Sequence, residues 1–232
     1  MLDGQESPAA NAATTARERR YRVLAGARRE HILGAAREAF VELGLEGASL
    51  REIAKRAGYT AGALYSYFPS KEDVYATLLA ESLERLNAQV AGAQLPPALA
   101  ASTSAASSAA TSAANELRLR ALAFFNFYRE HPRDLDLGFY LFHGMQPRGL
   151  TPLWNERLNG RLRGAMRLQE AALRALGFGV ADASTEVTAL FAHTVGLLLL
   201  SPTGRIRMFG RTSQDLFVRY VEDLLRRAPE RP

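Results

Sequence analysis

Cysteine is absent from this chain of 232 residues. Disulfides, thiolate metal sites and cysteine nucleophiles are therefore excluded. Histidine is scarce, and none of the four histidines stands in a spacing that pairs metal ligands or catalytic bases. No glycine-rich loop follows a strand pattern. We therefore expect no catalytic residues, no metal and no cofactor.

Long apolar runs and strand patterns are also lacking. The longest apolar stretch, residues 187–200, is interrupted by His193 and is too short to span a bilayer. The N-terminus has no basic region followed by a sustained apolar run, which is the pattern of a signal peptide. No stretch alternates apolar and polar residues as a strand would. The composition predicts an all-α, cytoplasmic protein without a membrane partner.

Negative charge is in the minority, because the formal net charge is +5. The excess concentrates near the N-terminus, where Glu18 is outnumbered by Arg17, Arg19, Arg20, Arg22, Arg28 and Arg29. Residues 1–15 offer no packing face, so we expect residues 1–27 to form a flexible basic arm. Such an arm would attract phosphate and track the minor groove of DNA, or it would simply be a solvated tail.

The most informative segment is residues 49–71, which contains two short helix patterns around a tight turn. Ser49, followed three residues later by Glu52, is typical of a reciprocal cap at a helix start. Gly58 is suited to end that helix, and Thr60 is suited to cap the next one. Two helices joined by so short a turn predict a helix-turn-helix, in which the second helix enters the major groove of DNA.

A preceding helix is expected over residues 28–44 and would complete a three-helix head over residues 28–74. Its apolar residues recur at steps of three and four, which places them on one face. These residues are Ile32, Leu33, Ala36, Phe40 and Leu43. They should bury against Leu50, Ile53, Leu64 and Phe68, because two helices alone bury too little apolar surface.

These motifs resemble the TetR family of bacterial transcriptional regulators. The resemblance covers roughly residues 28 to 80 and rests on Gly-x-x-Ser-Leu-Arg-x-Ile-Ala-x-x-Ala-Gly followed by Tyr-Thr-x-x-x-Leu-Tyr-x-Tyr-Phe-x-Ser-Lys-Glu. It implies an N-terminal helix-turn-helix head and a variable helical body that binds a small ligand and dimerises. Beyond residue 80 only the architecture matches.

The resemblance also implies which residues contact DNA. Lys71 matches a lysine that binds phosphate, while Tyr65 and Tyr67 match residues that reach the DNA backbone. The implied contacts are completed by Ser49 at a phosphate, Thr60 at the recognition-helix cap, Arg51 at a base edge, and Ala61, Gly62, Ala63 and Ser66 facing bases. Because these last four side chains are small, close backbone approach and DNA deformability would have to supply much of the sequence readout.

Each of these residues also has a structural interpretation. Tyr65 and Tyr67 could belong to the rim of the head, and Phe68 is expected to plug its core. Lys71 alone would be an ordinary solvated lysine. Arg51 and Lys55, four residues apart, could likewise both be solvated.

The rest of the chain, residues 75–232, predicts a helical body. A connecting helix over residues 72–94 carries Val74, Leu78, Leu79, Leu83 and Leu86 on one stripe. Residues 96–114 are rich in alanine and serine, and we expect a mobile insertion there. Five more helices are expected over residues 116–130, 133–145, 152–176, 183–200 and 213–226.

Aromatic residues crowd two of these body helices and suggest a cavity for a small, largely apolar or aromatic effector. The candidate ligand-binding residues are Phe124, Phe127, Tyr128, Phe139, Phe142, His143, Met166 and His193. An ordinary hydrophobic core, with satisfied core histidines, explains the same pattern.

The resemblance implies a homodimer formed through the helices at 183–200 and 213–226. The expected function is that of a ligand-responsive repressor that binds a palindromic operator in double-stranded DNA and is released by a small-molecule effector. The alternative is an all-α small-molecule binding protein or enzyme without specific DNA binding. Retention on heparin or random duplex DNA would discriminate between them.

Overall fold

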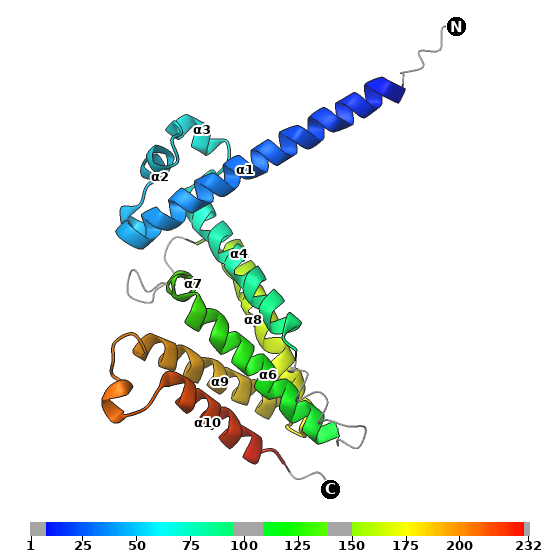
Figure 1. Cartoon of the computed structure of the whole chain (residues 1–232), viewed down its shortest axis with the longest axis vertical. Helices are drawn as coiled ribbons and strands as arrows, with labels where there is room; N and C mark the ends of the chain where they lie inside the picture. The colour runs from blue at the N-terminus through cyan, green and yellow to red at the C-terminus, as the bar shows by residue number, and fades with distance from the viewer. Residues whose placement is uncertain (1–7, 95–108, 139–149, 230–232) are drawn as a thin grey trace. The chain divides into compact units, whose positions relative to one another are not determined.

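The computed structural model describes residues 8–94, 109–138 and 150–229, and within these ranges it contains helices and no strands (Figure 1). The helices are α1 (Pro8–Gly47), α2 (Leu50–Arg56), α3 (Ala61–Tyr65), α4 (Lys71–Gly92), α6 (Ala109–Glu130), α7 (Pro132–Gly138), α8 (Pro152–Ala175), α9 (Val180–Leu200), the 3-10 turn η2 (Arg207–Phe209) and α10 (Ser213–Arg226). The predicted all-α class is confirmed. The chain divides into two compact units, Met1–Leu78 with Tyr140–Leu150, and Leu79–Phe139 with Thr151–Pro232.

The first helix is longer than predicted. It begins at Pro8 rather than near Arg28, so residues 8–27, expected to be flexible, are helical. Gly44, with φ 69° and ψ 175°, breaks the helix close to the predicted end. Glycine suits this position because the left-handed region is costly for residues that carry a Cβ atom.

The core of the first unit contains most of the predicted apolar residues. Ile32, Ala36, Ile53 and Leu64 have no exposed side-chain surface. Leu43 was predicted to join them, but that prediction is wrong, because Leu43 is 40% exposed. The residue lies just before the break at Gly44, where the straight-helix periodicity that predicted burial no longer applies.

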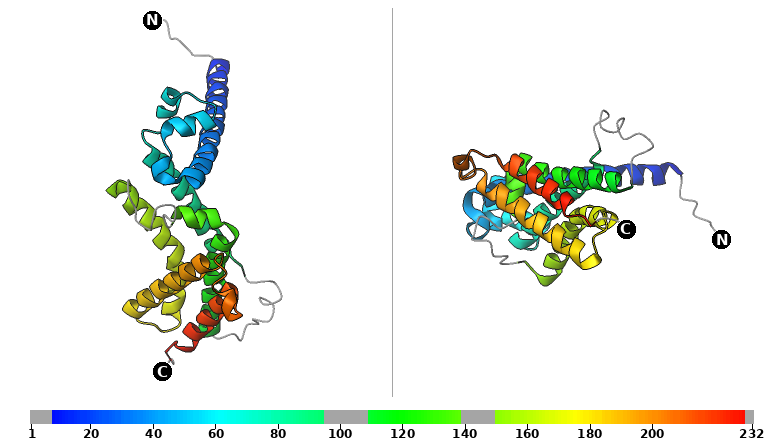
Figure 2. Two further views of the ribbon diagram at one scale, coloured as in Figure 1. Left: turned by 90° about the vertical axis from the view of Figure 1, so that its left-hand side faces the viewer. Right: turned by 90° about the horizontal axis from the view of Figure 1, so that it is seen from below.

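The second unit packs α6 against α8, α9 and α10, while α9 and α10 lie side by side (Figures 1 and 2). All five residues of the predicted α4 stripe are buried. Helix α6 begins at Ala109, so residues 109–114 are helical and do not belong to a mobile insertion as predicted. The other residues of that insertion, 96–108, lie outside the described ranges, as do residues 139–145 of the helix predicted over 133–145.

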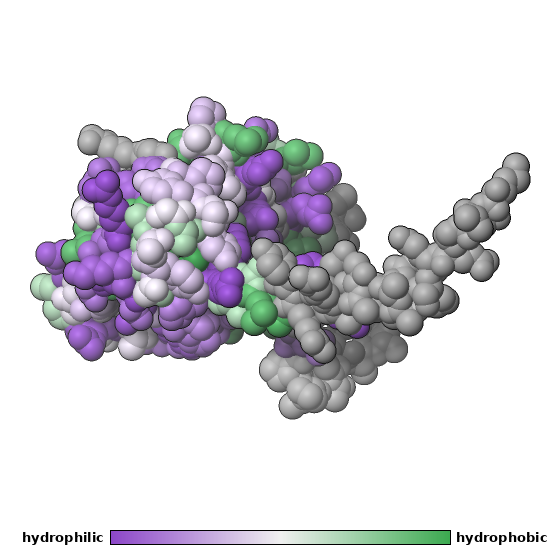
Figure 3. Space-filling view, turned by 90° about the horizontal axis from the view of Figure 1, so that it is seen from above, coloured by the Kyte–Doolittle hydropathy of each residue, from purple (hydrophilic) through white to green (hydrophobic). Residues whose placement is uncertain are grey.

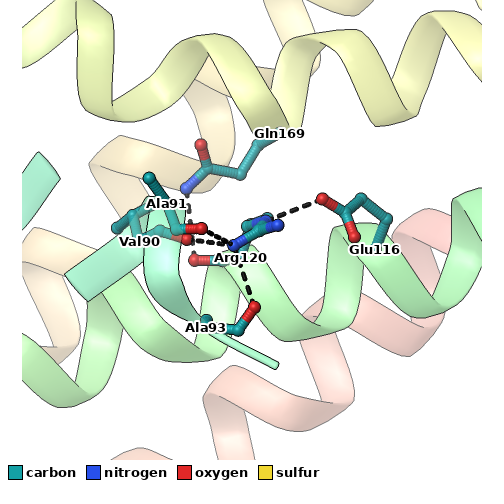
Figure 4. A network of polar contacts seen from close by, with 6 residues as sticks. All are labelled: Val90, Ala91, Ala93, Glu116, Arg120 and Gln169. Atoms are coloured by element: carbon teal, nitrogen blue, oxygen red, sulfur yellow. Dashed lines mark hydrogen bonds and ion pairs between the residues drawn. The ribbon is translucent and has the colours of Figure 1, made fainter. Parts of the chain in front are cut away.

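The C-terminal end of α4 is fixed to α6 by Arg120 (Figure 4). Its guanidinium donates to the carbonyl oxygens of Val90, of Ala91 at 2.9 Å and of Ala93 at 3.0 Å. Its Nε donates to Glu116 at 2.7 Å. The last carbonyls of a helix lack intrahelical partners, so this cation satisfies the acceptors that end α4.

Helix α9 is the one described helix that is long and apolar enough to cross a bilayer, judged by length and composition alone. Core helices of soluble proteins also pass this test, and part of α9 is buried inside the second unit. The helix is therefore weak evidence for a membrane span.

Candidate nucleic-acid interface

The turn between α2 and α3 is built by Gly58. Its φ of 70° places it in the left-handed region, where it donates from its amide to the Lys55 carbonyl at 3.2 Å. The Tyr59 amide donates to the Ala54 carbonyl at 2.8 Å. This pair of bonds is the Schellman arrangement, which satisfies the last carbonyls of α2 and turns the chain sharply. The predicted helix end at Gly58 is therefore confirmed.

Capping side chains fix the first turn of each helix of the motif. Ser49 Oγ accepts from the Glu52 amide at 3.2 Å, and Thr60 Oγ1 accepts from the Ala63 amide at 3.2 Å. The reciprocal half of the predicted Ser49 cap is not among the contacts of the described residues. Instead, the Glu52 carboxylate accepts from Arg56 Nε at 2.9 Å. An opposite charge one turn away competes for the carboxylate, which a short-range sequence pattern does not reveal.

Buried residues orient the short helix α3. Leu64 is fully buried and Phe68 is 3% exposed, so both anchor α3 and its following turn to the core. The predicted core role of Phe68 is confirmed. Because α3 is held by one face, its opposite face is left to solvent.

The ten predicted DNA contacts all lie at the surface, fully or partly exposed. Tyr65 is the most prominent large side chain, at 55% exposure. Ser49, Arg51, Thr60, Gly62, Tyr65 and Ser66 are exposed, and Ala61, Ala63, Tyr67 and Lys71 are intermediate. In the space-filling view from above, most of the coloured surface is hydrophilic, with hydrophobic residues in small separate patches (Figure 3).

Lys71 makes a contact that the sequence did not predict. Its Nζ donates to the carbonyl oxygen of Leu45 at 2.8 Å and to that of Glu46 at 3.4 Å. These carbonyls follow the break at Gly44, so the ammonium ties the start of α4 to the end of α1. An ammonium has three N–H donors, which leaves one for a phosphate oxygen.

Long-range contacts missed by sequence reasoning hold the three helices together. His31 on α1 donates from Nε2 to the Ala57 carbonyl at 3.1 Å, at the C-terminal end of α2. Arg56 Nη1 lies 2.8 Å from a carboxylate oxygen of Glu42, so this arginine bridges α1 and α2. The hydrogen bond to Glu42 is the main cause of a raised Arg56 pKa, followed by the bond to Glu52. His31 and Ala57 are too far apart in sequence for any local pattern to pair them.

Replacing Gly58 by alanine should destabilise the first unit by about 1 to 2 kcal/mol, because a Cβ atom is strained in the left-handed region. Space is not the cause, since nothing lies within 4 Å of a Cβ built at this position. Thermal unfolding of the full chain measures the effect. Gly62→Ala is the matched control, because a Cβ atom at Gly62 also has nothing within 4 Å but this residue lies inside α3. The stability of this variant should rise or stay unchanged, because alanine favours a helix more than glycine does. Equal unfolding temperatures for Gly58→Ala and wild type would contradict the prediction.

The candidate ligand residues that the structure describes lie on three helices of the second unit, α6, α8 and α9. Phe124, Phe127 and Tyr128 are almost fully buried on α6, and the Tyr128 ring meets the ring of Phe124 at a centroid distance of 5.3 Å and that of Phe127 at 5.1 Å. Phe124 also meets Phe191 of α9 at 6.1 Å. Burial raises the pKa of Tyr128, so its phenol is neutral. The structure thus brings three of the eight candidates into one aromatic cluster.

His193 contacts a different element. Its ring stacks on Tyr220 of α10 at 4.2 Å with an interplanar angle of 17°. Burial lowers its pKa, while a hydrogen bond to the Leu216 backbone partly opposes this shift. Met166 is half-buried on α8, and Phe139, Phe142 and His143 lie outside the described residues.

Three buried side-chain polar atoms of the described residues have no hydrogen-bond partner: Ser82 Oγ, Asn126 Oδ1 and His193 Nε2. Buried polar groups are normally paired, because an unsatisfied group costs free energy. Ser82 and Asn126 were not predicted as ligand residues. A serine or asparagine within a helix pattern gives no signal that its side chain is buried without a partner.

Helix α3 is the second helix of the motif, and it is both capped and exposed. This arrangement defines the first unit as a helix-turn-helix DNA-binding domain. The family profile described as "Bacterial regulatory proteins, tetR family" matches residues 32–78. The transcriptional repressor AcnR of Corynebacterium diphtheriae is 38% identical over 64 residues, which are 28% of this chain and 34% of AcnR. The repressor BepR of Brucella suis is 41% identical over 61 residues, which are 26% of this chain and 29% of BepR. The chain therefore spans about a third of the length of these relatives.

Solved structures match over most of the chain. The putative regulatory protein SCO4313 has a TM-score of 0.66 at 21% identity, with 89% of this chain and 98% of that chain covered. FadR from Bacillus subtilis, solved in complex with stearoyl-CoA, has a TM-score of 0.59 at 18% identity over 87% of this chain and 99% of its own. At such identities these matches show the fold. Together with the profile match over residues 32–78, they show that the chain resembles the TetR family in its helix-turn-helix domain and in its overall fold.

Proposed function

We propose that this protein is a DNA-binding transcriptional regulator, and most simply a repressor. The observation that carries the proposal is the exposed surface of α3, which Leu64 and Phe68 anchor from the core side and Thr60 caps at its start. A helix presented in this way is suited to the major groove. The repressors AcnR and BepR resemble the chain over 64 and 61 residues. As regulators act on the chromosome, we place the protein in the cytoplasm.

Selection of duplexes from a random pool tests the proposal. A regulator should enrich a sequence with two-fold symmetry, because each protomer of a dimer reads one half-site. No enrichment, together with no retention on duplex DNA at low salt, would leave the alternative of an all-α small-molecule binding protein. The proposal assigns no catalytic activity to the protein.

Substitution of Lys71 by methionine should weaken binding to the selected duplex about tenfold and make its salt dependence shallower by about 0.9 in log–log slope, the amount expected for one lost phosphate contact. Titrations at several salt concentrations measure both quantities. Lys55→Met is the matched control, because Lys55 is exposed on α2 and is not among the predicted contacts.

A loss of affinity without a change in slope would mean that Lys71 acts only through Leu45 and Glu46. Its hydrogen bonds to these carbonyls would then position α4 without any contact to DNA. Equal slopes for Lys71→Met and wild type would therefore contradict the phosphate contact while leaving the proposed function intact.

We further propose that the protein is a homodimer formed through the helices at 183–200 and 213–226. Ala181, Thr185, Thr188 and Ala192 are exposed at steps of three and four, so they share one face of α9. From Val187 to Leu200 the helix carries no carboxylate, lysine or arginine. An uncharged exposed face of this length is typical of a surface that a partner covers. The two recognition helices would then be about 34 to 36 Å apart, or a multiple of that distance.

The effector is proposed to be small and largely apolar or aromatic, and to bind near the aromatic residues of α6. The cluster of Phe124, Phe127 and Tyr128 supplies apolar contacts, and the unpartnered Asn126 Oδ1 on the same helix is a polar group that a ligand would satisfy. FadR, which has the same fold, binds stearoyl-CoA. Regulation requires only that the effector prefers the state that binds DNA poorly, with a coupling of about 1 to 3 kcal/mol.

Helix α4 is the proposed carrier of this coupling, because it begins in the first unit and its last carbonyls are held by Arg120 of α6.

A thermal-unfolding screen with acyl-CoA thioesters and planar aromatic compounds tests the effector class. Compounds that raise the unfolding temperature should also release the selected duplex. Stabilisation by polar sugars or nucleosides alone would contradict an apolar effector.

A further inference from the structure

The N-terminal part of α1 has no buried side chain before Ile32 among the residues whose side chains the structure describes. The buried residues of the helix begin at Ile32. Before that point Val23 is 67% exposed and Leu24 is 57% exposed. Figures 1 and 2 show this part of the helix extending away from α2 and α3. An isolated helix is only marginally stable in water, so a surface that covers it would add to its stability.

The charge of this extension indicates what that surface is. Between residues 17 and 29 the chain has six arginines and one glutamate, Glu18. Arg19, Arg22 and Arg28 are exposed, and none of the three forms an ion pair within the described part of the chain. Arginine in excess over carboxylate favours a polyanion, and phosphate is its best-matched partner.

The helical conformation changes the geometry expected from the sequence. An α-helix with its side chains is about 10 to 12 Å across. The minor groove of B-DNA is only about 6 Å wide, so an intact helix does not enter it. A flexible arm would track that groove, whereas a rigid helix must lie across the phosphates. At 1.5 Å per residue, the span from Arg17 to Arg28 is about 16 Å, or roughly five base pairs.

We propose that residues 17–28 form a basic helix that binds the phosphates of duplex DNA next to the operator, without reading sequence and without entering the minor groove. The inference rests on the proposed function, since the recognition helix must first place the head on DNA. It adds a second contact surface, which enlarges the protected footprint and steepens the salt dependence of binding.

Neutralising the extension tests its contact with phosphate. The variant with Arg17, Arg19, Arg20 and Arg22 all replaced by glutamine should bind a random-sequence duplex about tenfold or more weakly, with a log–log salt slope shallower by about 2 to 4. The matched control replaces four exposed arginines of the second unit, which are Arg163, Arg167, Arg174 and Arg205. It removes the same net charge and should change the slope by less than one. Equal effects of the two variants would overturn the proposal.

A proline tests the helical conformation without changing charge. Ala25→Pro interrupts α1 between the arginines and the core that begins at Ile32, so the head should still fold. Binding should weaken by most of the amount seen for the glutamine variant. Wild-type affinity in Ala25→Pro would show that a flexible arm suffices and would overturn the proposal.

The composition of the DNA flanks separates the two modes of contact. Selected duplexes with A·T-rich and G·C-rich flanks should bind equally well if the helix meets only phosphates, whereas an arm in the minor groove should favour A·T. A clear A·T preference would overturn the proposal. If the glutamine variant still selects the same operator, the proposed function stands, even where the extension contributes nothing. Stronger binding to phosphatidylglycerol vesicles than to duplex DNA would assign the helix to lipid instead.

Discussion

Replacing Phe217 by alanine should lower the free energy of unfolding by about 3 to 5 kcal/mol, the usual cost of deleting a buried phenyl ring. Phe217 on α10 stacks on Phe125 of α6 with ring centroids 4.5 Å apart and an interplanar angle of 17°. Phe217 is 1% exposed and Phe125 is fully buried. The cavity left by the ring would lie between α10 and α6, where Phe125 would lose its stacking partner. Urea unfolding of the full chain measures the change.

An ion pair also joins α6 and α10, and it should contribute far less to stability than the Phe217 ring. Arg118 donates to both carboxylate oxygens of Glu222, at 2.6 and 2.8 Å. This contact lowers the pKa of Glu222, mainly through the hydrogen bond to Arg118. Both side chains are about two-fifths exposed, and solvent screening limits such a pair to less than about 1 kcal/mol. Glu222→Gln should therefore cost much less than Phe217→Ala.

Val218→Ala is the matched control for Phe217→Ala, because Val218 is the next residue of α10 and is 44% exposed. The free energy of unfolding of Val218→Ala should differ from that of the wild type by no more than about 0.5 kcal/mol, as for other surface substitutions. A similar loss for both variants would mean that truncation of α10 matters more than the ring stack. A loss below 1 kcal/mol for Phe217→Ala would contradict the packing described here.

The helices of this fold are largely predictable from periodicity and caps. The bounds of α10 are those expected, because Thr212 caps its start and a clear apolar stripe follows. The extent of α1 was not predictable in the same way. Its first part has neither an apolar stripe nor a cap, so propensity alone decides whether it is helical. The start of α6 was missed for a related reason, since an alanine- and serine-rich stretch is weakly helical without packing.

Prediction of the candidate site succeeded for contacts within one turn and failed for contacts between helices. The caps at Ser49 and Thr60 follow from residue type and spacing. The Lys71 contact to Leu45 and the His31 contact to Ala57 depend on how three helices converge. No local pattern encodes such convergence. The roles of the exposed residues in DNA binding remain predictions, because they depend on a partner.

Substitution of Ala192 by glutamate should weaken the proposed dimer more than 100-fold, while the fold of each protomer is preserved. Ala192 is exposed on α9, so a longer charged side chain has room in the separate protomer. In a dimer formed through this face, two carboxylates would be buried without partners. An uncompensated buried charge costs about 3 kcal/mol or more, which corresponds to more than a hundredfold in the dissociation constant.

Sedimentation over a range of protein concentrations measures the dissociation constant. Ala171→Glu is the matched control, because Ala171 is exposed on α8, outside the proposed interface, and receives the same charge. Unchanged dimerisation in Ala192→Glu would place the interface elsewhere, and a monomeric wild type would refute the dimer altogether. Monomers would each read one half-site, so Ala192→Glu should bind the complete operator far more weakly while retaining single half-site affinity. Loss of half-site affinity as well would mean that the substitution damages the head, contrary to the exposed position of Ala192 in the second unit.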